Sequence, residues 1–359
     1  MVMICRPKDI NRMVVRCPNW VGDIVMATPL FDCLKANFPR AEIAAVIRPK
    51  ASGVIKDGPW FSRMIAVNDR NWRGLKETAR QIKEFKPEMG VVLPNSIRSI
   101  LAVWLGGAGD IYGYRRNFRG VLLKGGPKPL RKNGAIKAIP MTEYYLEIGR
   151  WLGLKMPENA LPRLYMSEQI RQQGDELLQR YGITAGEQVI GLNPGASFGS
   201  SKCWPPEYFA QLAEMLEKRL NARIILFTGP GEEPIAEAIM NQTRAKLIDA
   251  TPDKVDLEGL KPLVQRCDLL ITNDTGPRHY AAALGVPVVV LMGPTNPEYT
   301  FYRQDNEEVI RIDLPCSPCH KKVCPTEHEC MKAITPEIVL EKSLKLLKVE
   351  VGDNEHSRV

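Results

Sequence analysis

Short apolar runs alternate with helix-like segments along almost the whole chain, and this alternation limits the folds available to it. The first half has five runs of strand length, near 13–17, 43–47, 64–67, 91–93 and 110–112. The second half has five more, near 189–192, 223–227, 246–248, 269–272 and 288–291. Helix-like stretches lie between them, including 71–85, 206–220, 234–242 and 276–283. This pattern is typical of parallel sheets with crossover helices.

The chain has 359 residues, more than one hydrophobic core normally supports, so we expect two domains. Residues 164–188 are polar and helical in character and end in the turn-rich stretch YGITAGEQ. We therefore predict an N-terminal domain over 1–165, a C-terminal domain over 166–348 and a flexible tail over 349–359. The predicted fold class is α/β, with two Rossmann-like, doubly wound parallel-sheet domains facing each other across a ligand-binding cleft.

The composition argues against several classes of protein. A hydrophobic content of 44% and a charged content of 25% are ordinary for a globular domain. No apolar run approaches the ~18–20 residues that span a bilayer, and MVMICRPKDINR lacks the apolar centre of a signal peptide, so we expect a cytoplasmic protein. Of the net charge of +8, much lies in 111–142, which contains eight basic residues and no acidic one. Such a stretch could contact nucleic acid, anionic lipid or a phosphorylated substrate, or be a solvated loop.

The stretch RMVVRCPNWVGDIVMATP, residues 12–29, places a carboxylate just after the first predicted strand. The apolar run stops at Pro18, and Gly22-Asp23 opens a segment with helical spacing of apolar residues. A strand, a tight loop and a helix N-terminus form a ligand site at the carboxyl edge of a sheet. Asp23 is therefore either a general base or the N-cap of the helix.

Two loops in the second half have features that suit a nucleotide. In NPGASFGSSKCWPP, small residues let backbone amides approach a phosphate, Ser197 can donate to it, and Lys202 adds a positive charge. The alternative is an ordinary flexible loop. In FTGPGEEP, Glu232 or Glu233 could hold ribose hydroxyls, or either could simply cap the following helix.

The stretch NDTGPRHYAAALGVPVVVLMGPTNP is the strongest motif. Asp274, Thr275 and Gly276 follow a buried strand at a helix N-terminus, where backbone amides and the threonine hydroxyl can bind a diphosphate. His279 could support the phosphates, although a lone helical histidine is more often a packing residue. Thr295 lies in a second small loop, after the next strand. Two such loops after neighbouring strands favour a diphosphate site.

The chain resembles the lipopolysaccharide heptosyltransferases of glycosyltransferase family 9 from about residue 12 to about residue 348. The resemblance rests on four stretches: NWVGDIVMATP, LPNSIRSILAVWLGGAGDIYGYR, NPGASFGSSKCWP and NDTGPRHYAAALGVPVVVLMGPTNP. It implies a GT-B fold and an enzyme that moves heptose from ADP-heptose, bound by the C-terminal domain, to a heptosyl-Kdo2-lipid A acceptor, with inversion. The family's catalytic aspartate falls on Asp23, its loop lysine on Lys202, and its diphosphate-binding residues on Asp274, Thr275 and Gly276.

The resemblance also implies that the acceptor lies in the first half of the chain. The predicted acceptor contacts are Asn95, Ser96, Arg98, Arg115, Arg116 and Arg119. The basic run 115–137 would then meet the carboxylates and phosphates of the acceptor, so we expect a peripheral protein on the cytoplasmic face of the inner membrane and no nucleic-acid partner. Two other hypotheses are another nucleotide-sugar transferase or epimerase on the same fold, and a nucleic-acid-binding protein that uses the basic run.

Four cysteines gather in CSPCHKKVCPTEHEC, namely Cys316, Cys319, Cys324 and Cys330. A C-x2-C followed by two more cysteines can hold a structural zinc ion or an iron–sulfur cluster. A disulfide-capable loop and plain packed thiols are the alternatives.

We expect no cofactor to be required for transfer, because a lysine and helix amides can neutralise departing ADP. After the cluster, 336–347 predicts a helix.

Overall fold

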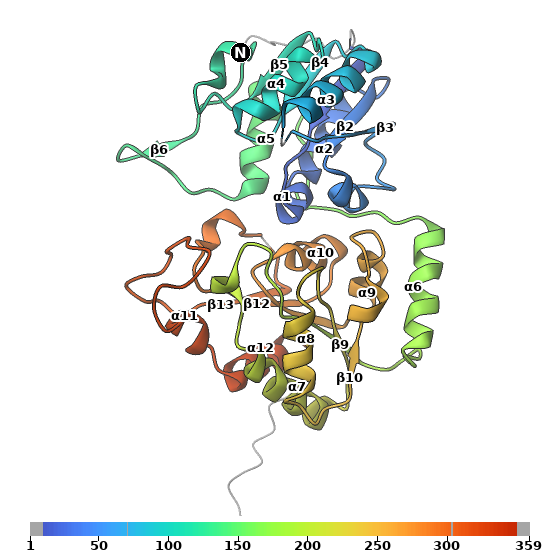
Figure 1. Cartoon of the computed structure of the whole chain (residues 1–359), viewed down its shortest axis with the longest axis vertical. Coiled ribbons are helices and arrows are strands. Elements are labelled where there is room, and N and C mark those ends of the chain that lie inside the picture. The colour runs from blue at the N-terminus through green and yellow to red at the C-terminus, as the bar shows by residue number, and fades with distance from the viewer. Residues whose placement is uncertain (1–9, 70, 303, 350–359) are drawn as a thin grey trace, which may run out of the picture. The chain divides into compact units, whose positions relative to one another are not determined.

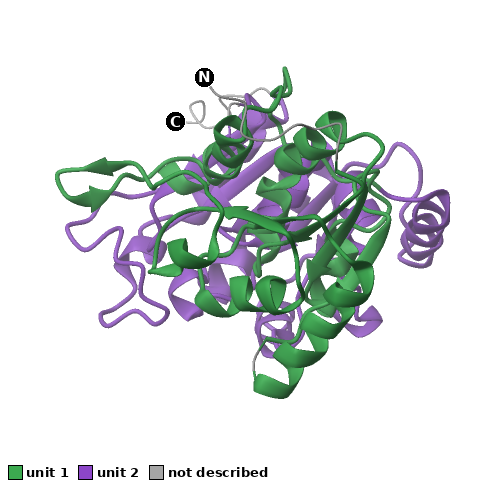
Figure 2. Ribbon diagram, turned by 90° about the horizontal axis from the view of Figure 1, so that it is seen from above, with its two compact units in different colours: residues 1–165, 298–301 green, residues 166–297, 302–359 purple. Residues whose placement is uncertain are grey.

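The computed structural model describes residues 10–69, 71–302 and 304–349. The predicted tail therefore lies, beyond Val349, outside the described residues. The chain divides into two compact units (Figure 2). Unit 1 comprises the residues up to Tyr165 together with Glu298–Phe301, and unit 2 comprises Met166–Pro297 and the residues from Tyr302 onward.

Unit 1 is built on a five-stranded parallel sheet in the order β3-β2-β1-β4-β5. Figure 1 labels four of these strands, β2, β3, β4 and β5. Its strands are β1 (Arg12–Arg16), β2 (Glu42–Ile47), β3 (Arg63–Ala66), β4 (Met89–Val92) and β5 (Asp110–Gly113). Its helices are α1 (Val21–Met26), α2 (Thr28–Asn37), α3 (Trp72–Phe85), α4 (Ile97–Leu105) and α5 (Met141–Trp151). A small antiparallel hairpin of β6 (Arg131–Lys132) and β7 (Ala135–Ile136) stands apart from the sheet.

Unit 2 has a six-stranded parallel sheet in the order β10-β9-β8-β11-β12-β13. Its strands are β8 (Val189–Asn193), β9 (Arg223–Leu226), β10 (Leu247–Asp249), β11 (Leu269–Asn273), β12 (Val288–Leu291) and β13 (Glu307–Ile310). Its helices are α6 (Glu168–Arg180), α7 (Pro206–Leu220), α8 (Glu233–Met240), α9 (Leu260–Arg266), α10 (Gly276–Leu284), α11 (Glu329–Lys332) and α12 (Pro336–Leu346). Both sheets are wound outward from their first strand in two directions, which is the doubly wound arrangement.

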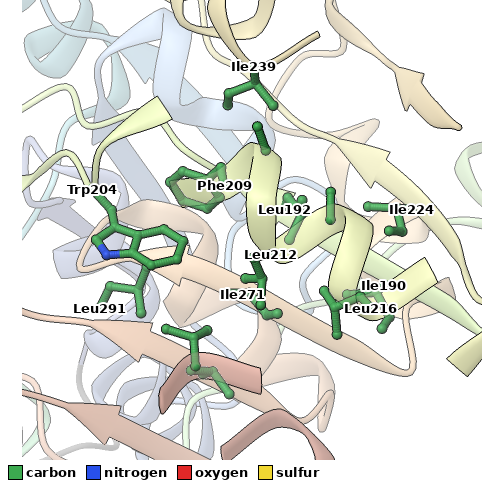
Figure 3. Close-up of a cluster of buried hydrophobic side chains, with 14 of the residues drawn as sticks. Ile190, Leu192, Trp204, Phe209, Leu212, Leu216, Ile224, Ile239, Ile271 and Leu291 are labelled. Carbon is green, nitrogen blue, oxygen red and sulfur yellow. The ribbon is translucent and has the colours of Figure 1, made fainter. Parts of the chain in front are cut away.

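The core of unit 2 forms where α7 packs on the sheet (Figure 3). Phe209, Leu212 and Leu216 recur at helical spacing along α7 and are fully buried. They meet alternate strand residues on one face of the sheet, including Ile190, Leu192, Ile224 and Ile271. The helical spacing of apolar residues in α7 and the alternation of strand residues across the sheet thus meet in one interior.

Every strand predicted from the apolar runs is present, whereas β13 and the β6–β7 hairpin were not predicted. β13 has the sequence EEVI and lies at the edge of the sheet. Its two glutamates leave only two apolar residues, which is too short a run to predict a strand. The hairpin has two exposed residues per strand and no buried face to leave a pattern. No helix within the described residues is long and apolar enough to cross a membrane.

Leu212 tests the packing of unit 2. Leu212→Ala removes a fully buried side chain between α7 and the sheet, so we expect the free energy of unfolding to fall by about 2–5 kcal/mol. Met240→Ala, at a residue 37% exposed in the same unit, should change it by less than about 1 kcal/mol. Urea unfolding curves measure both changes, and equal effects would contradict the packing of α7 on the sheet.

Candidate functional site

The two phosphate-suited loops of unit 2 follow β8 and β11, which are neighbours in the sheet. The chain continues from β8 toward β10 on one side and from β11 toward β13 on the other, so the topological switch point falls between them. In open α/β sheets, ligands bind beyond the carboxyl ends of the strands at this point. The Lys202 loop and the Asp274 loop therefore lie where the architecture places a ligand.

Three residues predicted to bind the nucleotide-sugar donor, namely Asp274, Lys202 and Thr295, meet at the carboxylate of Asp274. Its Oδ2 accepts hydrogen bonds from Lys202 Nζ at 2.7 Å and from Thr295 Oγ1 at 2.7 Å. Lys202 Nζ also donates to the backbone carbonyl of Asp274 at 2.8 Å. The loops that follow β8, β11 and β12 thus meet at one side chain.

A buried arginine completes this network. Arg278, in the first turn of α10, donates to Asp274 Oδ1 at 2.9 Å and also bonds Glu307 of β13. Burial alone raises the pKa of Asp274, but the positive charges of Lys202 and Arg278 outweigh it and hold that pKa well below its usual range. Asp274 is therefore ionised at neutral pH and keeps both cations in place.

Two buried asparagines fix the loops around this network. Asn273 Oδ1 accepts from the backbone N–H of Trp204 at 3.1 Å, and its Nδ2 donates to Pro194 O at 2.6 Å. Asn193 Nδ2 donates to Thr275 Oγ1 at 3.2 Å. A hydroxyl that accepts from Asn193 can still donate its own hydrogen, which suits a phosphate oxygen at the N-terminus of α10.

Four residues of this network are not among the predicted site residues, namely Asn193, Asn273, Arg278 and Glu307. The asparagines carried a signal, because each ends a buried strand, where an amide side chain is unfavourable unless it is hydrogen-bonded. The sequence around Arg278 and Glu307 contains no comparable signal. They are 29 residues apart in the sequence, and their pairing depends on a strand that the pattern did not show.

The two candidate glutamates have different surroundings. Glu232 Oε2 accepts from Gly229 N at 2.7 Å, and a Cβ added at Gly195 would lie 1.8 Å from the same oxygen. The Glu232 carboxylate thus touches the loops that follow both β8 and β9. Glu233 is exposed, and hydrogen bonds from the backbone N–H groups of Glu233 and Gly231 lower its pKa, as expected for a carboxylate at a helix start.

The remaining predicted donor residues differ in burial. Ser197 is exposed in the Lys202 loop. His279 is only 4% exposed, and its Nδ1 lies 2.6 Å from the Tyr302 hydroxyl. Burial, and then the charge of Arg278, lower the pKa of His279 to about 3. His279 is therefore neutral at pH 7, and its surroundings favour the packing role over phosphate binding.

In unit 1, Asp23 lies in the first turn of α1, after β1. The N-cap of this helix is Trp20, so the alternative of Asp23 as N-cap is wrong. The Tyr145 hydroxyl donates to Asp23 Oδ1 at 3.2 Å. Burial, and then the charge of Asp23, raise the pKa of Tyr145 well above its usual value, so the phenol stays protonated and remains a donor.

The predicted acceptor residues cluster after β4 and β5. Ser96 caps α4 through the N–H of Ser99, and Asn95 Oδ1 accepts from Tyr144 OH at 3.1 Å. Arg119 is 1% exposed and donates to Tyr114 O at 2.9 Å. This burial and backbone bond favour a role in holding the loop after β5 over a contact with the acceptor. The other three predicted contacts are more accessible; Arg98 and Arg115 are exposed and Arg116 is half-buried.

The four cysteines of the C-terminal cluster differ in burial. Cys316 is exposed, Cys330 is buried, and Cys319 and Cys324 are intermediate. None of the cysteines in the described chain forms a disulfide. Residues 10–69, 71–302 and 304–349 contain no group of three His, Cys, Asp or Glu placed to hold a metal ion. Zinc or iron–sulfur binding by this cluster therefore stays a prediction.

The fold and the site together define a class of protein. Two doubly wound parallel-sheet units, one with a lysine and a helix N-terminus at its switch point, are the parts of a GT-B glycosyltransferase. The sequence model of Glycosyltransferase family 9 (heptosyltransferase) matches residues 76–329. The chain belongs to this family, and the predicted family, the GT-B fold class and the transferase activity are confirmed.

Individual relatives match nearly the whole chain. Lipooligosaccharide heptosyltransferase 2 of Campylobacter jejuni is 28% identical over 344 residues, covering 94% of this chain and 98% of the relative. The structure of E. coli ADP-heptose lps heptosyltransferase II has a TM-score of 0.76 at 26% identity, covering 94% of this chain and 98% of that one. A glycosyl transferase family 9 structure from Veillonella parvula has a TM-score of 0.81 at 27% identity, covering 94% and 97%.

His279 provides a pH test of the interior of unit 2. Its folded-state pKa of about 3 lies below the ~6.5 of an unfolded histidine, so its full stabilisation is present above pH 6.5 and is lost as the pH falls toward 3. Lowering the pH from 7 to 5 should therefore cost the wild type about 2 kcal/mol through this group. We expect His279→Gln, whose amide can still bond Tyr302, to lose less, as measured by urea unfolding at both pH values. An equal loss would contradict a buried neutral histidine.

Proposed function

We propose that this protein transfers heptose from ADP-L-glycero-D-manno-heptose to the heptosyl-Kdo2-lipid A inner core of lipopolysaccharide, with inversion at the anomeric carbon. The observation that carries the proposal is the Lys202–Asp274 pair beside the N-terminus of α10, at the switch point of unit 2. The similarity to heptosyltransferases 2, which extends over 94% of this chain, supports the choice of sugar and acceptor.

In the proposed reaction, the bond between the anomeric carbon and the diphosphate oxygen breaks, and ADP leaves with the electron pair. Lys202 and the backbone amides of Thr275 and Gly276 neutralise the charge that develops on that diphosphate. The Thr295 hydroxyl, held by Asp274, lies in the same network. For the ribose, the position of the Glu232 carboxylate against the Gly195 and Gly229 loops favours Glu232 over the exposed Glu233.

Unit 1 supplies the base in this proposal. Asp23 takes the proton of the acceptor hydroxyl while that oxygen attacks the anomeric carbon. The buried Tyr145 hydroxyl donates to Asp23 Oδ1 and restricts the orientation of the carboxylate. Arg98, Arg115 and Arg116 are the accessible cations that we assign to the carboxylates and phosphates of the acceptor.

Removing the carboxylate of Asp23 tests the assignment of the base. We expect Asp23→Asn to lower kcat about 10²–10⁴-fold and to leave ADP affinity unchanged, because the donor residues belong to unit 2. The measurement is ADP release from ADP-heptose in the presence of heptosyl-Kdo2-lipid A. Asp57→Asn, an exposed aspartate of unit 1, is the matched control. Full activity of Asp23→Asn would exclude it as the base, and release without acceptor would favour the alternative of an epimerase or another nucleotide-sugar enzyme.

We also propose that unit 1 docks on the anionic membrane surface that carries the acceptor. Phe118 is 97% exposed and Val121 is 89% exposed. They line one shallow hollow together with Arg115, Arg116 and Lys128. The adjacent β6–β7 hairpin projects from the body of unit 1 (Figure 1) and carries Arg131 and Lys132. An exposed ring and an exposed aliphatic side chain among cations are what an anionic bilayer interface accommodates.

The backbone supports a role for Phe118 outside the folded interior. Phe118 has a φ of 59°, in the left-handed region that costs about 1–2 kcal/mol for a residue whose side chain makes no local hydrogen bond. This conformation leaves the ring in solvent, so packing within the chain does not compensate for it. Burial of the Phe118 ring in the bilayer interface would offset this backbone cost.

Phe118→Asn tests membrane docking without disturbing the backbone, because asparagine tolerates the left-handed region. We expect about ten-fold weaker binding to vesicles of phosphatidylglycerol and phosphatidylethanolamine. Phe301→Asn, at a residue 55% exposed, should bind like the wild type. Sedimentation at two salt concentrations measures both. Unchanged binding of Phe118→Asn, or stronger binding to a DNA duplex than to vesicles, would exclude this surface as the membrane contact.

A further inference from the structure

The cysteine-rich loop, residues 316–330, is hydrogen-bonded to the loop that carries Lys202. Ser201 N donates to Lys322 O at 3.1 Å, and Ser201 Oγ donates to Lys321 O at 2.5 Å. His328 Nε2 lies 2.8 Å from Ser201 O. Since a carbonyl oxygen can only accept, the imidazole is the donor in this bond. Three hydrogen bonds therefore hold the residue that immediately precedes Lys202.

The two loops also approach each other closely. A Cβ added at Gly199 would lie 2.2 Å from Lys322 O, and Gly199 has a φ of 154°. A side chain at this position would force the loops apart. Lys202 N in turn donates to Gly199 O at 3.2 Å and closes the short turn Ser200–Lys202. The backbone of Lys202 is thus fixed from the side of the cysteine-rich loop.

The same loop contacts the segment that carries Thr295. Ser317 Oγ donates to Gly293 O at 2.6 Å, and His320 N donates to Pro294 O at 2.8 Å. A Cβ at Gly293 would lie 2.7 Å from Cys330 Sγ. Two of the loops that meet at Asp274 are therefore bonded to one segment that contributes no group to that meeting point.

We propose that the cysteine-rich loop positions Lys202 and Thr295 for the donor diphosphate, with His328 as a positioning residue. This inference rests on the proposed function, because it takes the diphosphate of ADP-heptose as the ligand of Lys202. Displacing a charge-stabilising group by about 1 Å can slow a reaction about 100-fold. A segment that restrains two such loops at once therefore acts on the reaction without touching the substrate.

Paired substitutions at His328 test the proposal. We expect His328→Leu to lower kcat for heptose transfer about 10–100-fold and to weaken ADP binding. His328→Gln should restore most of both, because its amide nitrogen can donate to Ser201 O. His328 has a φ of 64°, so both replacements carry the same backbone strain. Glu327→Leu, which replaces a side chain that is 90% exposed in the same loop, is the matched control.

Adenosine distinguishes positioning from general damage, because it lacks the diphosphate. We expect His328→Leu to weaken ADP binding and to leave adenosine binding unchanged, as measured by calorimetry. Equal weakening of both, or no rescue by His328→Gln, would overturn the proposal. If His328→Leu does not fold, Ser317→Ala, which breaks the bond to Gly293, replaces it in the same measurements.

The outcomes separate this inference from the proposed function. Heptose transfer by the wild type together with an unaffected His328→Leu would overturn the positioning role and leave the function standing. ADP binding by the wild type without heptose transfer would overturn the function. In that case the split between ADP and adenosine binding would still decide whether the loop positions Lys202 for a diphosphate.

Discussion

The ionised carboxylate of Asp274 is the group on which the rest of the unit 2 site depends. It lies in the interior between Lys202 and Arg278, and each cation is within hydrogen-bonding distance of one of its oxygens. Removing one member of such a buried network leaves an uncompensated charge, which typically destabilises a protein by about 3–5 kcal/mol. Because the partners come from separate segments, the carboxylate also fixes the mutual positions of the loops after β8, β11 and β12.

The two units present different kinds of candidate residues on one architecture. In each sheet, the switch point lies between two neighbouring strands, β1 and β4 in unit 1 and β8 and β11 in unit 2, and the loops that follow them carry the candidate residues. In unit 1 these loops lead to Asp23, which accepts a hydrogen bond from the Tyr145 hydroxyl, and to the polar N-terminus of α4. In unit 2 they hold a lysine and the amides of α10. An acid–base group suits an acceptor hydroxyl, and a cation with helix amides suits a leaving diphosphate.

The fold and the three residues that meet in the candidate site were predictable from local patterns. Short apolar runs indicated every strand except β13 and the hairpin, and loop chemistry identified Lys202, Asp274 and Thr295, which the structure brings together. Other residues were beyond local patterns. The ion pair of Arg278 with Glu307 and the bond of His328 to Ser201, which is 127 residues away, leave no trace in neighbouring positions. Arg119 has the sequence context of a surface cation but lies buried under its own loop.

By itself, the sequence determined the α/β class, the doubly wound order of elements and the loops that end at the carboxyl edges of the strands. These follow from hydrophobic periodicity and from the chemistry of glycine, proline and helix N-termini, which act over a few residues. Only the tertiary structure decided which polar side chains are buried together. A buried charge is stable only beside partners of the opposite charge, and the fold, rather than the neighbouring sequence, brings Asp274, Arg278 and Glu307 together.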